Sequence, residues 1–168
     1  AGIQRTVNFS SEFGLFAGRC VLEVARHPGA LSYDVAVVCV AGALAAALYP
    51  KFNFRDTQEV AFVMMLSMGF TIALSSSRTF GDGRETRFRE LCEKGGIHAR
   101  PSSYFLAKLL VVDVPKVALL VLAFLAAWYP TAAPTRSFAT TYAVTFAAGF
   151  AASGVSHVVN LAQAPKTA

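Results

Sequence analysis

Three ionisable side chains fall inside a stretch that is otherwise apolar, YFLAKLLVVDVPKVALL, which begins at Tyr104. An ionisable group within a bilayer is costly unless it is paired or close to the surface, so Lys108, Asp113 and Lys116 are candidate functional residues. Lys108 is near the start of the stretch and can extend towards the membrane surface. Asp113 and Lys116 are three residues apart, which on a helix places them close enough to neutralise each other. Pro115 removes a backbone donor between them and is expected to kink the helix.

This intramembrane charge pair has two interpretations. A proton relay or an ion site would use the charges directly, whereas a self-neutralising pair near the inner boundary needs no function. His157 and Asn160 lie near the end of the last apolar stretch. A histidine there can ligate haem or chlorophyll, although membrane histidines are more often simply hydrogen-bonded.

Other catalytic and cofactor signatures are missing from the sequence. There is no G-x-x-x-x-G-K-[ST] loop, so the chain is not expected to hydrolyse ATP by itself. The cysteines, Cys20, Cys39 and Cys92, are far apart and show neither metal spacing nor a redox pair. We therefore predict reduced packing cysteines, no catalytic residue, no metal site and no cofactor site within the chain.

The chain that must position these side chains is 168 residues long, 55% hydrophobic and only 15% charged. Soluble domains carry about 25% charged residues. Apolar stretches occupy residues 30–49, 60–77, 104–129 and 138–160. A bilayer core takes roughly 20 helical residues, and spanning segments that are not barrels must be helices. The sequence predicts an all-α integral membrane protein with four transmembrane helices.

The last of these stretches is rich in small residues at four-residue spacing. Such spacing lets helices approach closely, so we expect this span to be buried among others. The positions are Ala143, Ala147 and Ala151 in one row and Gly149 and Ser153 in another.

The net charge of +5 is concentrated in two segments, which argues for membrane topology and against nucleic-acid binding. Positive residues favour the cytoplasmic side of a membrane. With four spans, both termini are then expected in the cytosol, while plasma membrane and organelle membrane remain alternatives. Before the first span lie Arg5, Arg19 and Arg26, and between the second and third lie Arg78, Arg84, Arg87, Arg89, Lys94 and Arg100.

Residues 1–29 are expected to form a cytosolic amphipathic helix. Ser10 or Ser11 can cap it, and it should continue to about His27, where Pro28 and Gly29 end it. Its charged residues share one face, opposite an apolar stripe. Such a helix either lies along the membrane surface or packs on another domain. The charged set is Glu12, Arg19, Glu23 and Arg26, and the apolar set is Phe9, Phe13, Phe16 and Cys20.

A second amphipathic helix is predicted over residues 83–94, on the cytosolic side between the second and third spans. Asp82 and Glu85 form a capping box, and Gly95 and Gly96 supply the end. Two pairs of opposite charge four residues apart support the helix. It is either a solvated connection or a surface that another domain contacts.

The order of these features resembles a known family. The segment RTFGDGRETRFRE, then a glycine turn, then SSYFLAKLLVVDVPK, resembles the transmembrane domain of G-subfamily ABC transporters of the white/brown-complex type. The resemblance implies that 1–29 is a connecting helix and that 30–168 is a partial transmembrane domain, four spans of the usual six. It also implies that 83–94 is a coupling helix that docks on a nucleotide-binding domain. The docking residues would be Glu85, Arg87, Phe88, Arg89 and Glu90.

The same resemblance implies a function. ATP and magnesium would be bound by a nucleotide-binding domain outside this chain, and the transmembrane domains would form a homodimer or heterodimer. Amphipathic molecules such as lipids or sterols would be exported by alternating access. In the family the second span lines a central cavity with an aromatic clamp, for which Phe70 is the positional candidate, with Met68, Thr71 and Leu74 around it.

Two other functions remain open. A transporter-like domain without an ATPase could serve as a structural subunit of a larger membrane complex, for example a respiratory or photosynthetic one. Bound pigment or lipid near His157 would favour that alternative. A stand-alone channel or carrier is the third, and it depends on Asp113 and Lys116 alone.

Overall fold

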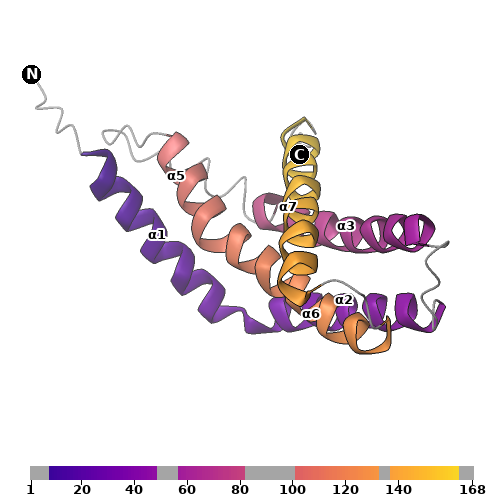
Figure 1. Cartoon of the computed structure of the whole chain (residues 1–168). Helices are drawn as coiled ribbons and strands as arrows, with labels where there is room; N and C mark the ends of the chain where they lie inside the picture. Colours follow the sequence, from indigo (N-terminus) through magenta and orange to yellow (C-terminus); the bar gives the residue numbers. More distant parts are fainter. Residues whose placement is uncertain (1–7, 49–56, 82–100, 133–136, 163–168) are drawn as a thin grey trace, which may run out of the picture.

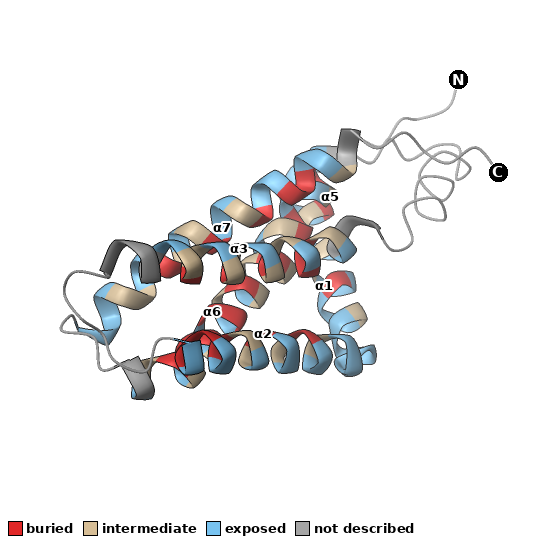
Figure 2. Cartoon of the chain, turned by 90° about the vertical axis from the view of Figure 1, so that its right-hand side faces the viewer, coloured by how far each residue is buried: buried red, intermediate tan, exposed pale blue. Residues whose placement is uncertain are grey.

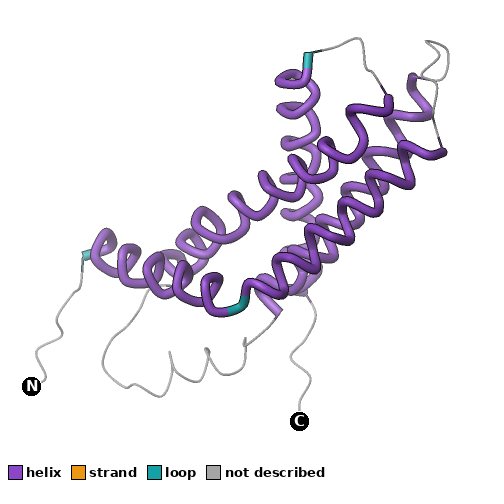
Figure 3. Tube along the Cα trace, turned by 90° about the horizontal axis from the view of Figure 1, so that it is seen from below, coloured by secondary structure: helices purple, strands orange, loops and turns teal. Residues whose placement is uncertain are grey.

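The computed structural model of the chain describes residues 8–48, 57–81, 101–132 and 137–162, and within these ranges all the regular structure is helical (Figure 3). The prediction of an all-α fold is confirmed for this part of the chain. The predicted helix at 83–94 lies outside the described residues. The elements are α1 (Phe9–Arg26), α2 (Pro28–Leu48), α3 (Thr57–Gly81), α5 (Pro101–Lys108), the π-helix η1 (Leu109–Asp113), α6 (Val114–Ala132) and α7 (Phe138–Ala162).

Helices long and apolar enough to cross a bilayer occur three times in the described residues, so this is a helical membrane protein. They are Pro28–Leu48, the continuous run Ser102–Pro130 through α5, η1 and α6, and Phe138–Asn160. These match the first, third and fourth predicted spans. The apolar part of α3, Phe62–Arg78, is shorter. The fourth crossing, and the side of the membrane on which each terminus lies, therefore stay predictions.

Helix α1 begins slightly earlier than the sequence suggested. Asn8 precedes it in an extended conformation, and its carbonyl accepts hydrogen bonds from the backbone N–H groups of Ser11 and Glu12 at 3.0 and 3.1 Å. Ser11 therefore lies within the first turn and does not cap it. The predicted end is confirmed, because α1 stops at Arg26 and Pro28 starts α2. Proline fits the first position of a helix, where its missing N–H has no partner to lose.

Helix α1 packs along the start of the third predicted span. It runs beside α5 (Figure 1). The rings of Phe16 and Tyr104 meet edge to face, with their centroids 5.6 Å apart. The Ser103 hydroxyl donates to the Glu12 carboxylate at 3.4 Å, so Glu12 is buried rather than on an exposed charged face. Leu15 and Leu22 remain exposed. The helix thus contacts the membrane domain on one side and presents apolar side chains on another.

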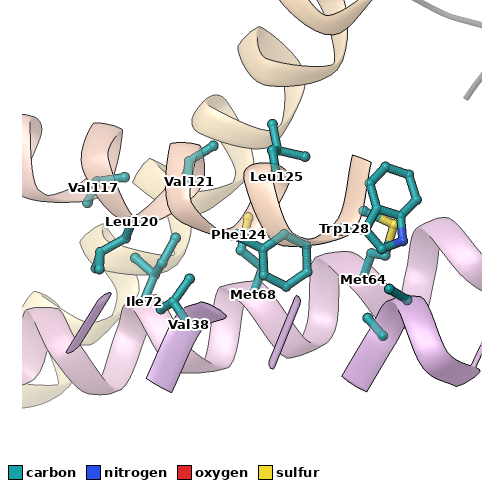
Figure 4. Close-up of a cluster of buried hydrophobic side chains, with 12 residues drawn as sticks. Val38, Met64, Met68, Ile72, Val117, Leu120, Val121, Phe124, Leu125 and Trp128 are labelled. Atoms are coloured by element: carbon teal, nitrogen blue, oxygen red, sulfur yellow. The ribbon is translucent and has the colours of Figure 1, made fainter. Parts of the chain in front are cut away.

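Helix α6 forms the middle of the hydrophobic core. Val117, Leu120 and Phe124 on this helix have no exposed surface, and they pack between α2 and α3 (Figure 4). The partners include Val38 of α2 and Met68 of α3. Figure 2 shows the buried residues of the helices on their inward sides, with exposed residues outside. Large apolar side chains also cover the outer sides of the helices. Burial therefore marks the contacts between helices, and it does not separate apolar from polar residues as it does in a protein surrounded by water.

Helix α7 only partly follows the prediction from its small residues. Gly149 and Ser153 are buried, and a Cβ added at Gly149 would lie 2.8 Å from the Ile72 side chain of α3. This close approach lets α3 and α7 pack tightly. Ala147 and Ala151, from the other small-residue row, are exposed. The small residues therefore bury one side of α7, and the alanine row faces outward.

Gly42 tests how tightly α2 packs on α6. A Cβ at this position would lie 2.8 Å from the backbone oxygen of Phe124 and 3.1 Å from the Cβ of Ala127. Backbone atoms of a packed helix move little, so Gly42→Ala should destabilise the protein by about 1–3 kcal/mol. Thermal unfolding of the purified protein in detergent measures this.

The control is Gly154→Ala, where a Cβ would meet nothing within 4 Å. Because alanine is the better helix former, this variant should be neutral or more stable by up to about 1 kcal/mol. An unfolding temperature of Gly42→Ala equal to that of Gly154→Ala would contradict the packing described here.

Candidate functional site

The kink predicted at Pro115 takes the form of a π-helix. Residues Leu109–Asp113 form one π-helical turn, in which the backbone N–H of Val114 bonds to the carbonyl of Leu109. A proline in a helix cannot donate to the carbonyl four residues back, and the ring crowds that carbonyl. Widening the preceding turn relieves this conflict, and such π-bulges often occur at functional sites. The last residue of the widened turn is Asp113, which is completely buried.

Asp113 is held by three side chains from two other helices. Its Oδ1 accepts a hydrogen bond from the Ser76 hydroxyl at 3.1 Å, and its Oδ2 accepts one from the Ser153 hydroxyl at 2.7 Å. The Nε2 of His157 lies 3.0 Å from the same Oδ2. All four residues are buried. We call Asp113, Ser76, Ser153 and His157 the Asp113 cluster.

A second buried carboxylate lies nearby on α2. Asp34 Oδ2 accepts a hydrogen bond from the Ser75 hydroxyl at 2.5 Å and pairs with Lys116 Nζ at 3.1 Å. Its Oδ1 pairs with Arg78 Nη2 at 3.3 Å. Lys116 also donates to the Ser75 carbonyl at 2.9 Å. We call Asp34, Ser75, Arg78 and Lys116 the Asp34 cluster.

The two clusters are adjacent because Ser75 and Ser76 are consecutive residues of α3. Together the clusters connect α2, α3, the η1–α6 helix and α7. Two further hydrogen bonds join α7 to α3: the Ser156 hydroxyl donates to the Ala73 carbonyl at 2.7 Å, and the Asn160 amide donates to the Ser77 carbonyl at 2.9 Å. The C-terminal half of α3 is therefore fixed by polar contacts on several sides.

The electrostatics of this arrangement are balanced. Two carboxylates, Asp34 and Asp113, face two permanent cations, Arg78 and Lys116, plus the His157 ring. A buried ion pair repays its desolvation only when further hydrogen bonds satisfy the remaining polar atoms. The serine hydroxyls provide such bonds here. The clusters can therefore act as a fixed joint between helices, and a change of charge within them would loosen it.

The predicted pair of Asp113 with Lys116 is replaced by pairs with other helices. Lys116 contacts Asp34, and Asp113 contacts His157. Residues three positions apart on a helix differ by about 60° around its axis, enough for the two side chains to reach different neighbours. Lys108 is also buried, with its Nζ 3.5 Å from the Tyr104 hydroxyl.

Sequence reasoning missed Asp34 and the serines. Asp34 is an acidic residue within the first predicted span, which is the same signal that identified Asp113 as a candidate. The serines occur as SSSR at 75–78 and as SGVSH at 153–157, each near the end of an apolar stretch. Polar residues in that position are the signal that was available.

The residues proposed for a substrate cavity fall on different faces of α3. Phe70 and Leu74 are exposed, with 66% and 50% of their surface accessible, whereas Met68 is 1% exposed in the core. The Thr71 hydroxyl donates to the carbonyls of Ser67 and Met68. Phe62 and Leu66 extend the row of Phe70 and Leu74 at four-residue spacing. We call Phe62, Leu66, Phe70 and Leu74 the outer α3 stripe.

The residues proposed to dock a nucleotide-binding domain, Glu85, Arg87, Phe88, Arg89 and Glu90, lie outside the described residues. Among the residues that are described, no group of three or more His, Cys, Asp or Glu side chains could hold a metal ion. No known protein family, curated protein or solved structure matches this chain.

The Asp34 cluster predicts strong coupling between Asp34 and Lys116. Asp34→Asn removes the carboxylate from Lys116 and from the half-exposed Arg78, and it should destabilise the protein by about 1–3 kcal/mol. Lys116→Met should cost less, because Asp34 keeps Arg78 and Ser75. The double variant should lose less free energy of unfolding than the two single variants lose together, by about 1 kcal/mol or more, because it leaves fewer unpaired charges.

The free energy of unfolding in mixed detergent micelles, followed by circular dichroism, measures all three variants. Losses that add to within about 0.5 kcal/mol would show that the two residues do not interact.

Proposed function

We propose that this chain is part of the transmembrane domain of an ATP-driven exporter of the G-subfamily type, which moves lipid-like or amphipathic molecules by alternating access. The observation that carries the proposal is the two-faced character of α3. One face of this helix is fixed by the core and by the polar clusters, and the other carries the outer α3 stripe. This is the helix on which the family resemblance places the substrate cavity.

The outer α3 stripe has the chemistry that such a cavity needs. Its two phenylalanines and two leucines offer a broad apolar surface, and the described part of the chain leaves it uncovered. A helix whose inner face is fixed can line a cavity with a defined shape. Two copies of the chain meeting at this stripe would enclose an apolar space suited to a sterol or an acyl chain, with Phe70 as the aromatic clamp.

The polar clusters support the mechanism. Residues 83–94 follow α3 directly in sequence and lead into α5, so a displacement of this segment by a nucleotide-binding domain acts on both helices. Because the clusters join α2, α3, α6 and α7, these helices would move together as one body. ATP and magnesium would act in the partner domain, and this chain would contribute coupling and the substrate path.

The molecular mass of the natural protein tests whether a motor is attached. An antibody against residues 81–96 on a denaturing gel should detect a band of about 60 kDa or more, the size of a soluble domain plus six spans. A band near the 17.9 kDa of this chain, without a separate ATPase that co-purifies, would rule out active export.

The second candidate function is a structural subunit of a larger membrane complex. Exposed apolar residues on α2 and α7, among them Leu44 and Val158, are compatible with it, because such surfaces fit contacts with other membrane subunits as well as with lipid. A gel band near 17.9 kDa, together with stable co-purification of unrelated membrane proteins or a pigment, would support this function.

Photo-crosslinking tests the dimer contact. Replacing Phe70 with the photoreactive p-benzoylphenylalanine should give, after illumination of native membranes, a product of twice the mass of the natural chain. The matched control has the same replacement at Leu44 of α2, which is 59% exposed. A dimer product that forms at Leu44 and not at Phe70 would contradict the assignment of the outer α3 stripe to the dimer interface.

A further inference from the structure

A hollow of about 980 Å³ lies between α1, the start of α2, the end of α3 and the η1 region. It is separate from the outer α3 stripe. Its polar wall includes Asp34, Arg78 and Lys116 of the Asp34 cluster, together with Arg26 and Lys108. The volume is large enough for the headgroup and the first part of the chains of one lipid.

The lining of this hollow carries excess positive charge. Among the described residues that form it, the basic side chains are Arg26, Arg78, Lys108 and Lys116, and the acidic ones are Glu23 and Asp34. Four positive and two negative charges leave a net charge of +2, with His27 counted as neutral. The end of α1 and the start of α2 both form part of the wall, so their opposite helix-dipole charges largely cancel. An anion is the complementary ligand.

The rest of the wall is apolar. Val21 and Val24 of α1, Leu31 of α2, and Val111 and Val112 of η1 face the same space. A free inorganic anion gains nothing from such a surface, whereas an acyl chain does. Val21 and the neighbouring Leu22 are more than half exposed, so the apolar wall continues onto the outside of α1. A lipid could therefore enter from the side.

We propose that this hollow binds one anionic phospholipid, with the headgroup against Arg26 and Lys108, and with the acyl chains along the valines of α1 and η1. The sequence predicts that the basic end of the helix bundle lies at the cytosolic leaflet, where anionic lipids are concentrated. The proposal needs only a membrane-embedded chain. It holds or fails independently of the exporter function.

Native mass spectrometry of the natural protein in detergent tests this site. The protein is titrated with phosphatidylglycerol or with phosphatidylcholine, and the lipid-bound fraction is measured. Phosphatidylglycerol should bind more tightly. Arg26→Gln should weaken its binding about fivefold, as expected for one basic residue at a membrane surface. Ala25→Trp should also weaken binding, because it fills part of the hollow without changing its charge.

The matched control is Arg19→Gln, which removes the same charge from an exposed position of the same helix outside the hollow. This variant should bind phosphatidylglycerol like the unchanged protein. Equal affinity for the two lipids, or equal losses in Arg19→Gln and Arg26→Gln, would overturn the proposal. Displacement of the lipid by millimolar inorganic phosphate would show a site for free anions, which also overturns it. Circular dichroism confirms that each variant is folded.

Discussion

Buried charge in an apolar surrounding is the constraint on which the rest of this structure depends. Asp113 has no exposed surface and Asp34 has 5%, so each carboxylate takes most of its hydrogen-bond donors from the protein. The donors come from three other parts of the chain: two serines and Arg78 of α3, Lys116 of α6, and Ser153 and His157 of α7. Apolar packing alone would tolerate many relative positions of these helices. The polar contacts select one of them.

A local feature of the backbone makes this selection possible. Pro115 prevents a regular helix across residues 109–115, and the chain accommodates it with a π-helical turn that ends at Asp113. The widened turn allows Asp113 to face α3 and α7, while Lys116, just beyond the proline, faces α2. The two side chains reach different helices because residues three positions apart lie about 60° apart around the helix axis.

The sequence predicted the helices well and their neighbours poorly. Apolar stretches place three of the four predicted spans to within a few residues, since hydrophobicity over a helical length is a local property. The partners of Asp34 are not local. Ser75 is 41 residues from Asp34 in the chain, and Lys116, which bonds to the Ser75 carbonyl, is another 41 residues beyond Ser75. Periodicity identifies the faces of a helix, but not the helix that each face meets. Glu12 shows the same limit, because its burial depends on Ser103, which is 91 residues away.

The two proposed binding surfaces share a structural origin in α3. Its outer stripe is available because the opposite face is held by α6 and α7, and its last turns supply Arg78 to the wall of the hollow. Arg78 and Lys116 therefore belong both to the Asp34 cluster and to the proposed lipid site. The proposed headgroup contacts, Arg26 and Lys108, line the same hollow as these two cations. A lipid in the hollow would therefore lie next to the ion pairs that join α2, α3 and α6.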